Sequence, residues 1–221
     1  MALLRMKSAM PSPTEALPGR SMPLRVPETH FVNGHRIVPP FPAGLEEAIF
    51  AMGCFWGTEA AFEQLKGVNQ VVAGYAGGDQ EHASYDKYEA SNHAECVKIT
   101  YDPHQITYAQ LLQVFFTLGQ PTVKDGQQPD MGHEYRMAVF YENDDQKRVA
   151  ESYVQQLTAD HVFDSPIAVT VENMPHGFFP AEEYHQHYVA QHPNESYVET
   201  VSMAKVRHIR DAFKDWLRQG A

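Results

Sequence analysis

The order in which strand-like and helix-like segments alternate constrains the fold of this chain more than any other feature. Short apolar or alternating runs predict strands over residues 46–52, 68–78, 94–102, 135–143 and 166–173. Helical periodicity predicts helices over residues 58–67, 107–119, 144–160, 180–192 and 204–219. The order begins β-α-β-β-α-β, which predicts an α+β, two-layer ferredoxin-like sandwich with a mixed sheet and additional C-terminal helices.

Proline content sets the first part of the chain apart from the rest. Eight of the 15 prolines fall within residues 1–45, and this density predicts an extended arm. We therefore expect a proline-rich N-terminal extension over residues 1–45, a main domain over residues 46–200 and a C-terminal helical tail over residues 201–221.

Composition excludes several classes of protein. The formal net charge of −11 disfavours binding to nucleic acid. No apolar run approaches the roughly 20 residues of a membrane helix, and the apolar stretch near the N-terminus is too short for a secretory signal. We therefore expect a cytoplasmic protein that binds neither membranes nor nucleic acid. Its two cysteines, Cys54 and Cys96, are too few for a disulfide scaffold or a Cys-rich zinc site.

Cys54 lies in the stretch "GCFWG", where a predicted buried strand ends and a helix begins. The free N–H groups and the dipole of a helix N-terminus favour a thiolate, so we expect a lowered pKa for Cys54. Gly53 and Gly57 permit a sharp turn and close approach of another molecule. Phe55 and Trp56 are either plugs of the core or the walls of an apolar pocket beside the thiol.

Glu95 is a candidate proton donor because of its place on the strand predicted over residues 94–102. Side chains alternate along a strand, so Glu95 shares one face with Val97 and Ile99, while Cys96 points to the other face. Burial beside apolar residues raises the pKa of a carboxyl group and lets it keep a proton near neutral pH. The alternative is that Glu95 is exposed at the end of the strand.

Four separate stretches resemble the A-type peptide-methionine sulfoxide reductases. In the order of that family, they are "GCFWG" with a following "AGYAGG", "HAECVKITYDP", "DMGHEYRMAVFY" and "FFPAEEYHQHY", and together they span roughly residues 44–195. The resemblance implies an enzyme that reduces methionine-S-sulfoxide, both in proteins and as the free amino acid, without a cofactor. It makes residues 46–200 the catalytic domain.

The resemblance also assigns roles to individual residues. Cys54 is implied as the nucleophile and Glu95 as the acid for the departing oxygen. Tyr85 and Tyr135 are implied to hold that oxygen by hydrogen bonds. Phe55 and Trp56 then form the pocket for the S-methyl group, and Asp130 positions either the substrate backbone or Tyr135.

Two other interpretations of Cys54 stay open. A Cys–His acyl-transfer enzyme requires a histidine oriented by Asn or Asp, and nothing selects one of the 12 histidines. A redox sensor or peptide-binding module would be oxidised at Cys54 without turnover. We expect no metal site at His185, His187 and His192, because ligands two residues apart diverge by about 200° on a helix.

The tail departs from the family pattern in one respect. Many members carry further cysteines near the C-terminus that resolve the oxidised catalytic sulfur, whereas residues 97–221 contain none. Because Cys96 points away from the Glu95 face, a Cys54–Cys96 disulfide is not expected. An external thiol, either thioredoxin or glutathione with glutaredoxin, is then required as the reductant.

Overall fold

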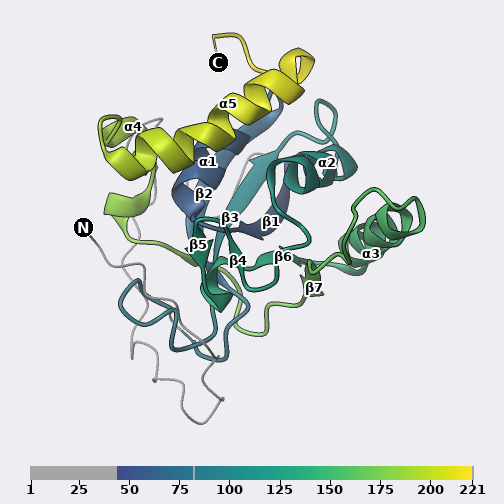
Figure 1. Ribbon diagram of the computed structural model, residues 1–221, viewed down its shortest axis with the longest axis horizontal. Helices are drawn as coiled ribbons and strands as arrows, with labels where there is room; N and C mark the ends of the chain where they lie inside the picture. Colours follow the sequence, from purple (N-terminus) through teal and green to yellow (C-terminus); the bar gives the residue numbers. More distant parts are fainter. Residues whose placement is uncertain (1–43, 82, 221) are drawn as a thin grey trace.

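The computed structural model describes residues 44–81 and 83–220 (Figure 1). The predicted N-terminal extension therefore lies outside the described residues, except for its last two positions. The first half of the described chain contains β1 (Glu46–Met52), α1 (Phe55–Phe62), β2 (Val68–Ala76), β3 (Ala94–Tyr101), α2 (Tyr108–Leu118), β4 (Gly126–Gln127), β5 (Asp130–Met131) and a 3-10 helix (His133–Tyr135). The second half contains β6 (Met137–Phe140), α3 (Asp144–Ala159), β7 (Thr170–Glu172), β8 (Phe179–Pro180), a 3-10 helix (Glu183–His185), α4 (Tyr188–Gln191), a π-helix (Val198–Ser202), α5 (Met203–Ala212) and a 3-10 helix (Lys214–Trp216).

The main sheet is mixed, and its strands follow the order β7-β6-β1-β3-β2-β8. β1 lies between β3 and β6 and is antiparallel to both. β2 and β3 are antiparallel, whereas β6 and β7 are parallel. The predicted α+β class with a mixed sheet is thereby confirmed.

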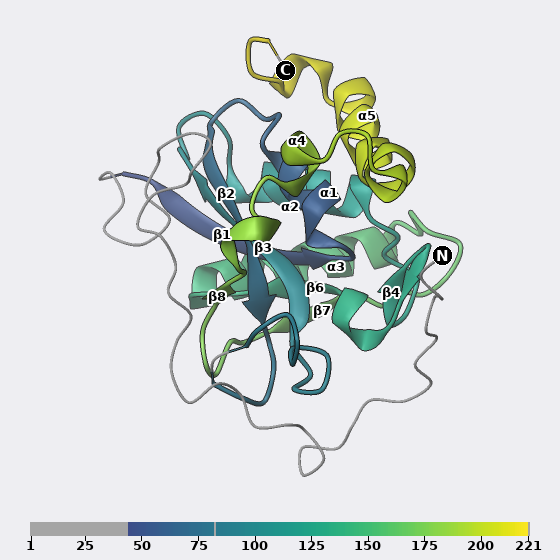
Figure 2. The ribbon, with the colours of Figure 1, turned by 90° about the vertical axis from the view of Figure 1, so that its left-hand side faces the viewer.

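The two faces of the sheet are covered differently. The larger core lies under the helices and includes Val97 and Ile99 of β3 together with Phe62 of α1 and Phe115 of α2. The opposite face carries a smaller core that contains Cys96 and Phe140, against which Met174 and Phe178 pack. In two views the helices α1, α2, α4 and α5 lie to one side of the strands (Figures 1 and 2).

Several predicted elements agree closely with the observed ones. The strand expected over residues 46–52 is β1. Thr107 is the N-cap of α2, as expected, and Gln110 completes a capping box in which each side chain bonds the backbone of the other. The strands expected over residues 135–143 and 166–173 form but are shorter, because pairing in β6 and β7 is restricted to a few residues.

The predicted start of the first helix is wrong by three residues. α1 begins at Phe55 rather than at residue 58, with Cys54 at its N-cap, and passes through Gly57 without a break. A Cβ atom at Gly57 would lie 2.9 Å from the Cα atom of Ser202. Glycine at this position therefore serves the close packing of α1 against the π-helix rather than a turn.

The helix predicted over residues 180–192 is also wrong, because this segment breaks into a strand pair, a 3-10 helix and the short helix α4. His187 has a positive φ of 51°. The side chain of Gln186 binds the backbone of β2 instead of pointing to solvent: its Oε1 accepts from Ala73 N at 3.0 Å, and its Nε2 donates to Ala73 O at 2.9 Å. These contacts with the edge of the sheet replace helical hydrogen bonds.

The C-terminal segment packs against α1. Helix α5 lies along α1 (Figure 1) and ends at Ala212, earlier than the predicted end of the helix. Leu217 forms an isolated bridge with Leu65, which anchors the end of the chain next to α1. Within the described residues, no helix combines the length and apolar character needed to span a membrane.

Candidate active site

Cys54 sits in a sharp turn between β1 and α1. Gly53 has a positive φ of 70°, and a Cβ atom there would lie 2.6 Å from Cβ of Gln127, so the turn requires glycine. The Thr58 hydroxyl donates to the carbonyl oxygen of Cys54 at 3.1 Å, which ties the turn to the first turn of α1. The thiol is 9% exposed and therefore lies at the floor of the site.

The expected lowering of the Cys54 pKa is contradicted. Burial is the largest influence and raises the pKa of the thiol well above its ordinary value, and the nearby charge of Glu95 raises it further. Lys205, the backbone N–H of Trp56 and the Tyr197 hydroxyl act in the opposite direction but do not prevail. In the substrate-free protein the sulfur is therefore a thiol, and the helix N-terminus alone does not ionise it.

Glu95 faces the same side of the sheet as the helices, as the alternation along β3 predicted. Its Oε2 accepts a hydrogen bond from Phe55 N at 3.0 Å, and its Oε1 accepts one from the Tyr88 hydroxyl at 2.9 Å. The side chain is 2% exposed, and burial raises the pKa of its carboxyl group to about 7. The alternative of an exposed Glu95 is wrong, and the expected rise in pKa is confirmed.

The two predicted tyrosines approach this carboxyl group through Tyr88. The hydroxyl groups of Tyr135 and Tyr88 are hydrogen-bonded to each other, which extends the network from Glu95 to Tyr135. Tyr85 stacks on Tyr88 at 5.7 Å between ring centroids and is 40% exposed. Burial raises the pKa of Tyr85 to about 12, so both predicted phenols keep their protons and can donate hydrogen bonds.

Phe55 and Trp56 have different surroundings. Phe55 is fully buried among aromatic rings, which matches the core-plug alternative. Trp56 is partly exposed, stacks on Tyr188 at 3.8 Å between centroids and donates its indole N–H to Nδ1 of His185 at 3.1 Å. Burial lowers the pKa of His185 to about 4, so its ring is neutral and can accept this bond. Trp56 is thus held in a fixed orientation beside Cys54.

Asp130 is linked to the Cys54 thiol through the hydroxyl group of Tyr197. The Tyr197 hydroxyl donates to Oδ2 of Asp130 and is also hydrogen-bonded to Cys54. Burial raises the pKa of Asp130. The predicted contact of Asp130 with Tyr135 is not among the observed hydrogen bonds, and its partner is Tyr197 instead.

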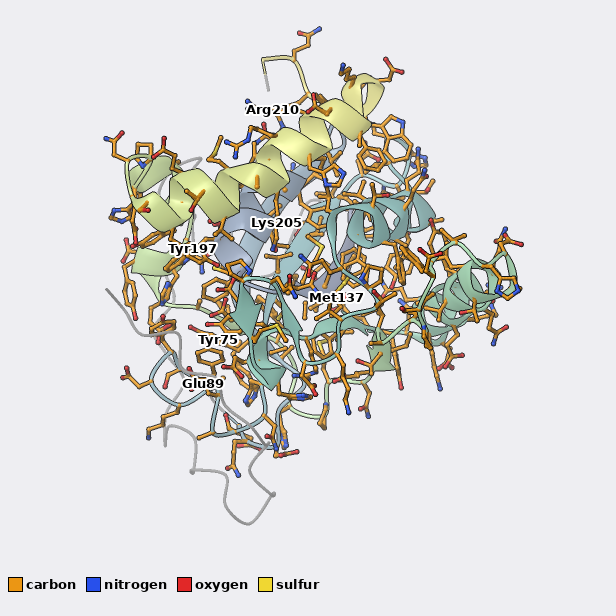
Figure 3. The ribbon with its side chains drawn as sticks, viewed as in Figure 1. Tyr75, Glu89, Met137, Tyr197, Lys205 and Arg210 are labelled. Atoms are coloured by element: carbon orange, nitrogen blue, oxygen red, sulfur yellow. The ribbon has the colours of Figure 1, made fainter. Side chains whose placement is uncertain are left out.

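Three residues of this site were missed from the sequence: Tyr88, Tyr197 and Lys205. Tyr88 follows Tyr85 by three positions in a loop, and sequence spacing within a loop does not predict where a side chain points. Lys205 lies between Ser202 and Val206, two buried residues of the C-terminal segment (Figure 3). A cation inside the buried side of an amphipathic pattern is the one signal that could have singled it out.

The two cysteines lie on opposite faces of the sheet. Cys54 belongs to the larger core under the helices, and Cys96 to the smaller core on the other side. Both are free thiols. The expectation that Cys96 points away from the Glu95 face is confirmed.

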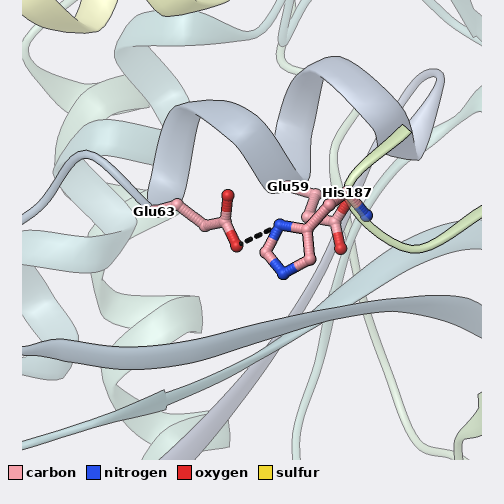
Figure 4. A group of neighbouring side chains, drawn as sticks. All are labelled: Glu59, Glu63 and His187. Atoms are coloured by element: carbon pink, nitrogen blue, oxygen red, sulfur yellow. Dashed lines mark hydrogen bonds and ion pairs between the residues drawn. The ribbon is translucent and has the colours of Figure 1, made fainter. Parts of the chain in front are cut away.

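A second group of polar side chains lies on the far part of α1 (Figure 4). Glu59, Glu63 and His187 bring potential metal-ligand atoms within 4.8 Å of one another. His187 Nδ1 lies 2.9 Å from Oε1 of Glu63, and the backbone N–H of His187 donates to Glu59 Oε2 at 2.7 Å. Burial raises the pKa of Glu59, which favours its neutral form. These contacts fasten the turn at residue 187 to α1 and so support His185.

Together these residues define a class of site: a thiol at a helix N-cap, next to a carboxyl group that can carry a proton at neutral pH, beneath an aromatic wall and surrounded by phenols. Such a site suits a nucleophilic attack by sulfur with proton delivery to the atom that leaves.

Comparison with known proteins identifies the family. The model of the peptide methionine sulfoxide reductase family matches residues 46–217. The peptide methionine sulfoxide reductase MsrA of Chromobacterium violaceum is 44% identical over 176 residues, which cover 79% of this chain and 99% of that protein. MsrA 2 of Synechocystis sp. is 42% identical over 178 residues, covering 79% of this chain and 83% of that protein. The structure of methionine sulfoxide reductase A of Corynebacterium diphtheriae superposes with a TM-score of 0.71 at 28% identity, covering 85% of this chain and 93% of that one. The chain belongs to the peptide methionine sulfoxide reductase family and is an oxidoreductase.

Proposed function

We propose that the chain reduces methionine-S-sulfoxide in proteins and peptides, and the free amino acid as well, with Cys54 as the nucleophile. The observation that carries this proposal is the carboxyl group of Glu95, which hydrogen-bonds the first N–H of the helix that Cys54 begins, at 3.0 Å. This bond places a proton carrier of pKa about 7 beside the thiol. The repair of oxidised methionine is the resulting activity.

The proposed reaction moves one oxygen atom from the substrate sulfur to the Cys54 sulfur. The thiol transfers its proton to the Glu95 carboxylate, and the resulting thiolate attacks the sulfoxide sulfur to form an S–S bond. Glu95 gives the proton to the sulfoxide oxygen, and the S–O bond to the methionine sulfur breaks. The hydroxide so released bonds to the Cys54 sulfur while the S–S bond breaks, its electron pair stays on the methionine sulfur, and Cys54 is left as a sulfenic acid. The sulfoxide gains two electrons and the cysteine loses two, so methionine and the sulfenic acid are the products.

The surrounding residues supply the substrate contacts in this proposal. The ring of Trp56, held by His185, forms the wall of the S-methyl pocket, while buried Phe55 supports it from the core. Tyr85 and Tyr135 donate hydrogen bonds to the sulfoxide oxygen. Asp130 accepts a hydrogen bond from Tyr197 and thereby orients the Tyr197 hydroxyl group next to Cys54.

Regeneration of Cys54 requires an external thiol, for which we propose thioredoxin or glutathione with glutaredoxin. Support comes from the position of Cys96, which is buried on the opposite face of the sheet. We also propose a cytoplasmic location and a division of the chain into an extension (1–45), a catalytic domain (46–200) and a tail (201–221). The catalytic domain has a ferredoxin-like arrangement in this proposal, supported by the neighbouring order β6-β1-β3-β2 and the connection through α1 and α2.

Turnover of defined epimers tests this function. Purified protein is incubated with dithiothreitol and with peptides that contain either the S- or the R-epimer of methionine sulfoxide. We expect steady consumption of the S-epimer, loss of that activity in Cys54→Ser and retention of most of it in Cys96→Ser. Equal loss in both variants would refute the assignment of Cys54, and oxidation of Cys54 without turnover would favour a redox sensor. Hydrolysis of esters or amides that is blocked by alkylation would favour an acyl-transfer enzyme.

A further inference from the structure

The ammonium group of Lys205 contacts the turn that carries Cys54 from the side of α5. Its Nζ lies 2.6 Å from the carbonyl oxygen of Met52, 3.0 Å from Oγ1 of Thr58 and 3.5 Å from the carbonyl oxygen of Cys54. An ammonium group has three N–H donors, so these three acceptors, which lie on both sides of the nucleophile, account for its full capacity. Figure 3 shows Lys205 on α5, away from the exposed Arg210.

We propose that Lys205 is a positioning residue for the reductase reaction: it fixes the turn at Cys54 and stabilises the negative charge that forms on the Cys54 sulfur. This inference rests on the proposed function of Cys54. It makes the C-terminal helix α5 a part of the active site rather than an appendage to it.

The charges around Cys54 show why a cation is needed there. The other ionisable groups that act on the thiol, or on Lys205 beside it, are acids from several elements: Glu95 of β3, Asp130 of β5, Tyr197 of the π-helix, and Tyr85, Tyr135 and Tyr188. Negative charge on any of them disfavours a thiolate. Among these groups Lys205 alone carries positive charge, and its effect lowers the pKa of Cys54 against the effect of burial.

The packing of the C-terminal segment against α1 brings Lys205 to the turn that carries Cys54. Gly57 lets the backbone of Ser202 come within contact distance of α1, and Nζ of Lys205, three residues further on, then contacts Oγ1 of Thr58. Burial lowers the pKa of Lys205, but the neighbouring Cys54 and Asp130 act in the opposite direction and favour its charged form. The charge therefore lies at a partly buried position beside the turn of Cys54.

The test compares Lys205→Met with Arg207→Met, an exposed position on the same helix that serves as the matched control. The rate of Cys54 alkylation by iodoacetamide is measured against pH by mass spectrometry of the Cys54 peptide, which requires no substrate and no turnover. We expect Lys205→Met to shift the profile to higher pH, with at least a roughly tenfold slower rate near pH 8.5, the effect of one unit of pKa. Arg207→Met should match the wild type.

A second variant separates the two parts of the proposal. Thr58→Val removes one hydrogen-bond partner of Lys205 but keeps its charge, so it should slow single-turnover reduction of a methionine sulfoxide peptide without shifting the alkylation profile. Lys205→Gln, which lacks the charge but can still donate to the Met52 carbonyl, replaces Lys205→Met if the latter does not fold. An alkylation profile of the uncharged variant that coincides with that of Arg207→Met would overturn the proposal. Loss of turnover in all proteins, wild type included, would instead refute the proposed function.

Discussion

At Glu95, burial and two hydrogen bonds have opposite effects on the carboxyl group. Desolvation favours the protonated form, whereas the Phe55 N–H and the Tyr88 hydroxyl favour the carboxylate. The result is a pKa of about 7, below that of the buried Cys54 thiol. The pair therefore loses its first proton near neutral pH, and in the substrate-free protein the remaining proton stays on the thiol.

This order of pKa values predicts the pH dependence of the chemical step. Below pH 7 both groups are protonated and no thiolate can form, so the single-turnover rate should rise with pH through about 7 and then level off. The rate is measured by quenching reduced protein mixed with a methionine sulfoxide peptide. A rate that falls as the pH rises through 7 would show that the doubly protonated pair is the reactive form.

Removal of the proton carrier tests the same pair. Glu95→Gln keeps the size of the side chain but cannot transfer a proton, and general acid–base catalysis is typically worth about 10²–10⁴-fold. We expect a single-turnover rate lower by that range, with a rate that keeps rising above neutral pH because Cys54 must then ionise alone. A rate within about twofold of the wild type would exclude Glu95 from this role.

The hydroxyl groups of Tyr85 and Tyr135 should contribute less than Glu95. Phe at either position removes one donor to the oxygen, while the other donor remains. We expect each single variant to slow the reduction step less than Glu95→Gln does, and the double variant to slow it more than either single one. Tyr75→Phe is a suitable control, because the Tyr75 hydroxyl donates to Glu182 rather than to a residue placed in the reaction. A double variant as fast as the wild type would contradict the proposed role.

Which site residues could be predicted from sequence depended on how local their determinants are. Glu95 and Cys96 were assigned to opposite faces from the alternation of a single strand, and this assignment is confirmed. The protonation state of Cys54 was not predictable in the same way, since it depends on burial and on the charge of Glu95, 41 positions away. The contact of Lys205 with the Cys54 turn was not predictable either, because it arises from the packing of α5 on α1.

At the scale of elements, strands and the long helices were predicted better than the segment that completes the site. The capping box of α2 is contained within four neighbouring residues and could be recognised directly. The segment 180–192 contains a helical pattern of apolar residues, but Gln186 forms its hydrogen bonds with β2 and His187 its bonds with α1. Such long-range bonds outweigh local propensity and are not encoded in spacing.

The broken segment matters because it holds Trp56 through His185 and Tyr188. For Trp56→Ala we expect a lower kcat/KM for methionine sulfoxide peptides and a smaller change in thermal stability, because the partly exposed indole contacts substrate as well as protein. Contact between an aromatic ring and sulfur is worth about 0.3–1.5 kcal/mol, in addition to the apolar area lost. Steady-state kinetics and Tm are measured together, and an unchanged kcat/KM with a large drop in Tm would show that Trp56 is only a core residue.

At the scale of the whole molecule, the sheet separates the two thiols of the described residues. Cys54 lies under the helices and Cys96 on the far face, in a cluster of apolar side chains that includes Phe140. Burial raises the pKa of Cys96 as well, so it is neither positioned nor ionised to attack an oxidised Cys54. The oxidised enzyme is therefore expected to wait for a thiol from outside the chain.

The proposal that Cys54 alone reduces the sulfoxide is tested most directly by a single round of oxidation without reductant. Reduced protein is mixed with excess S-sulfoxide peptide and dimedone, and the products are mapped by mass spectrometry. The proposed mechanism predicts one equivalent of methionine per protein, a dimedone adduct of sulfenic acid on Cys54 and a free thiol on Cys96. A Cys54–Cys96 disulfide in most molecules, or methionine formed while Cys54 remains unmodified, would contradict it.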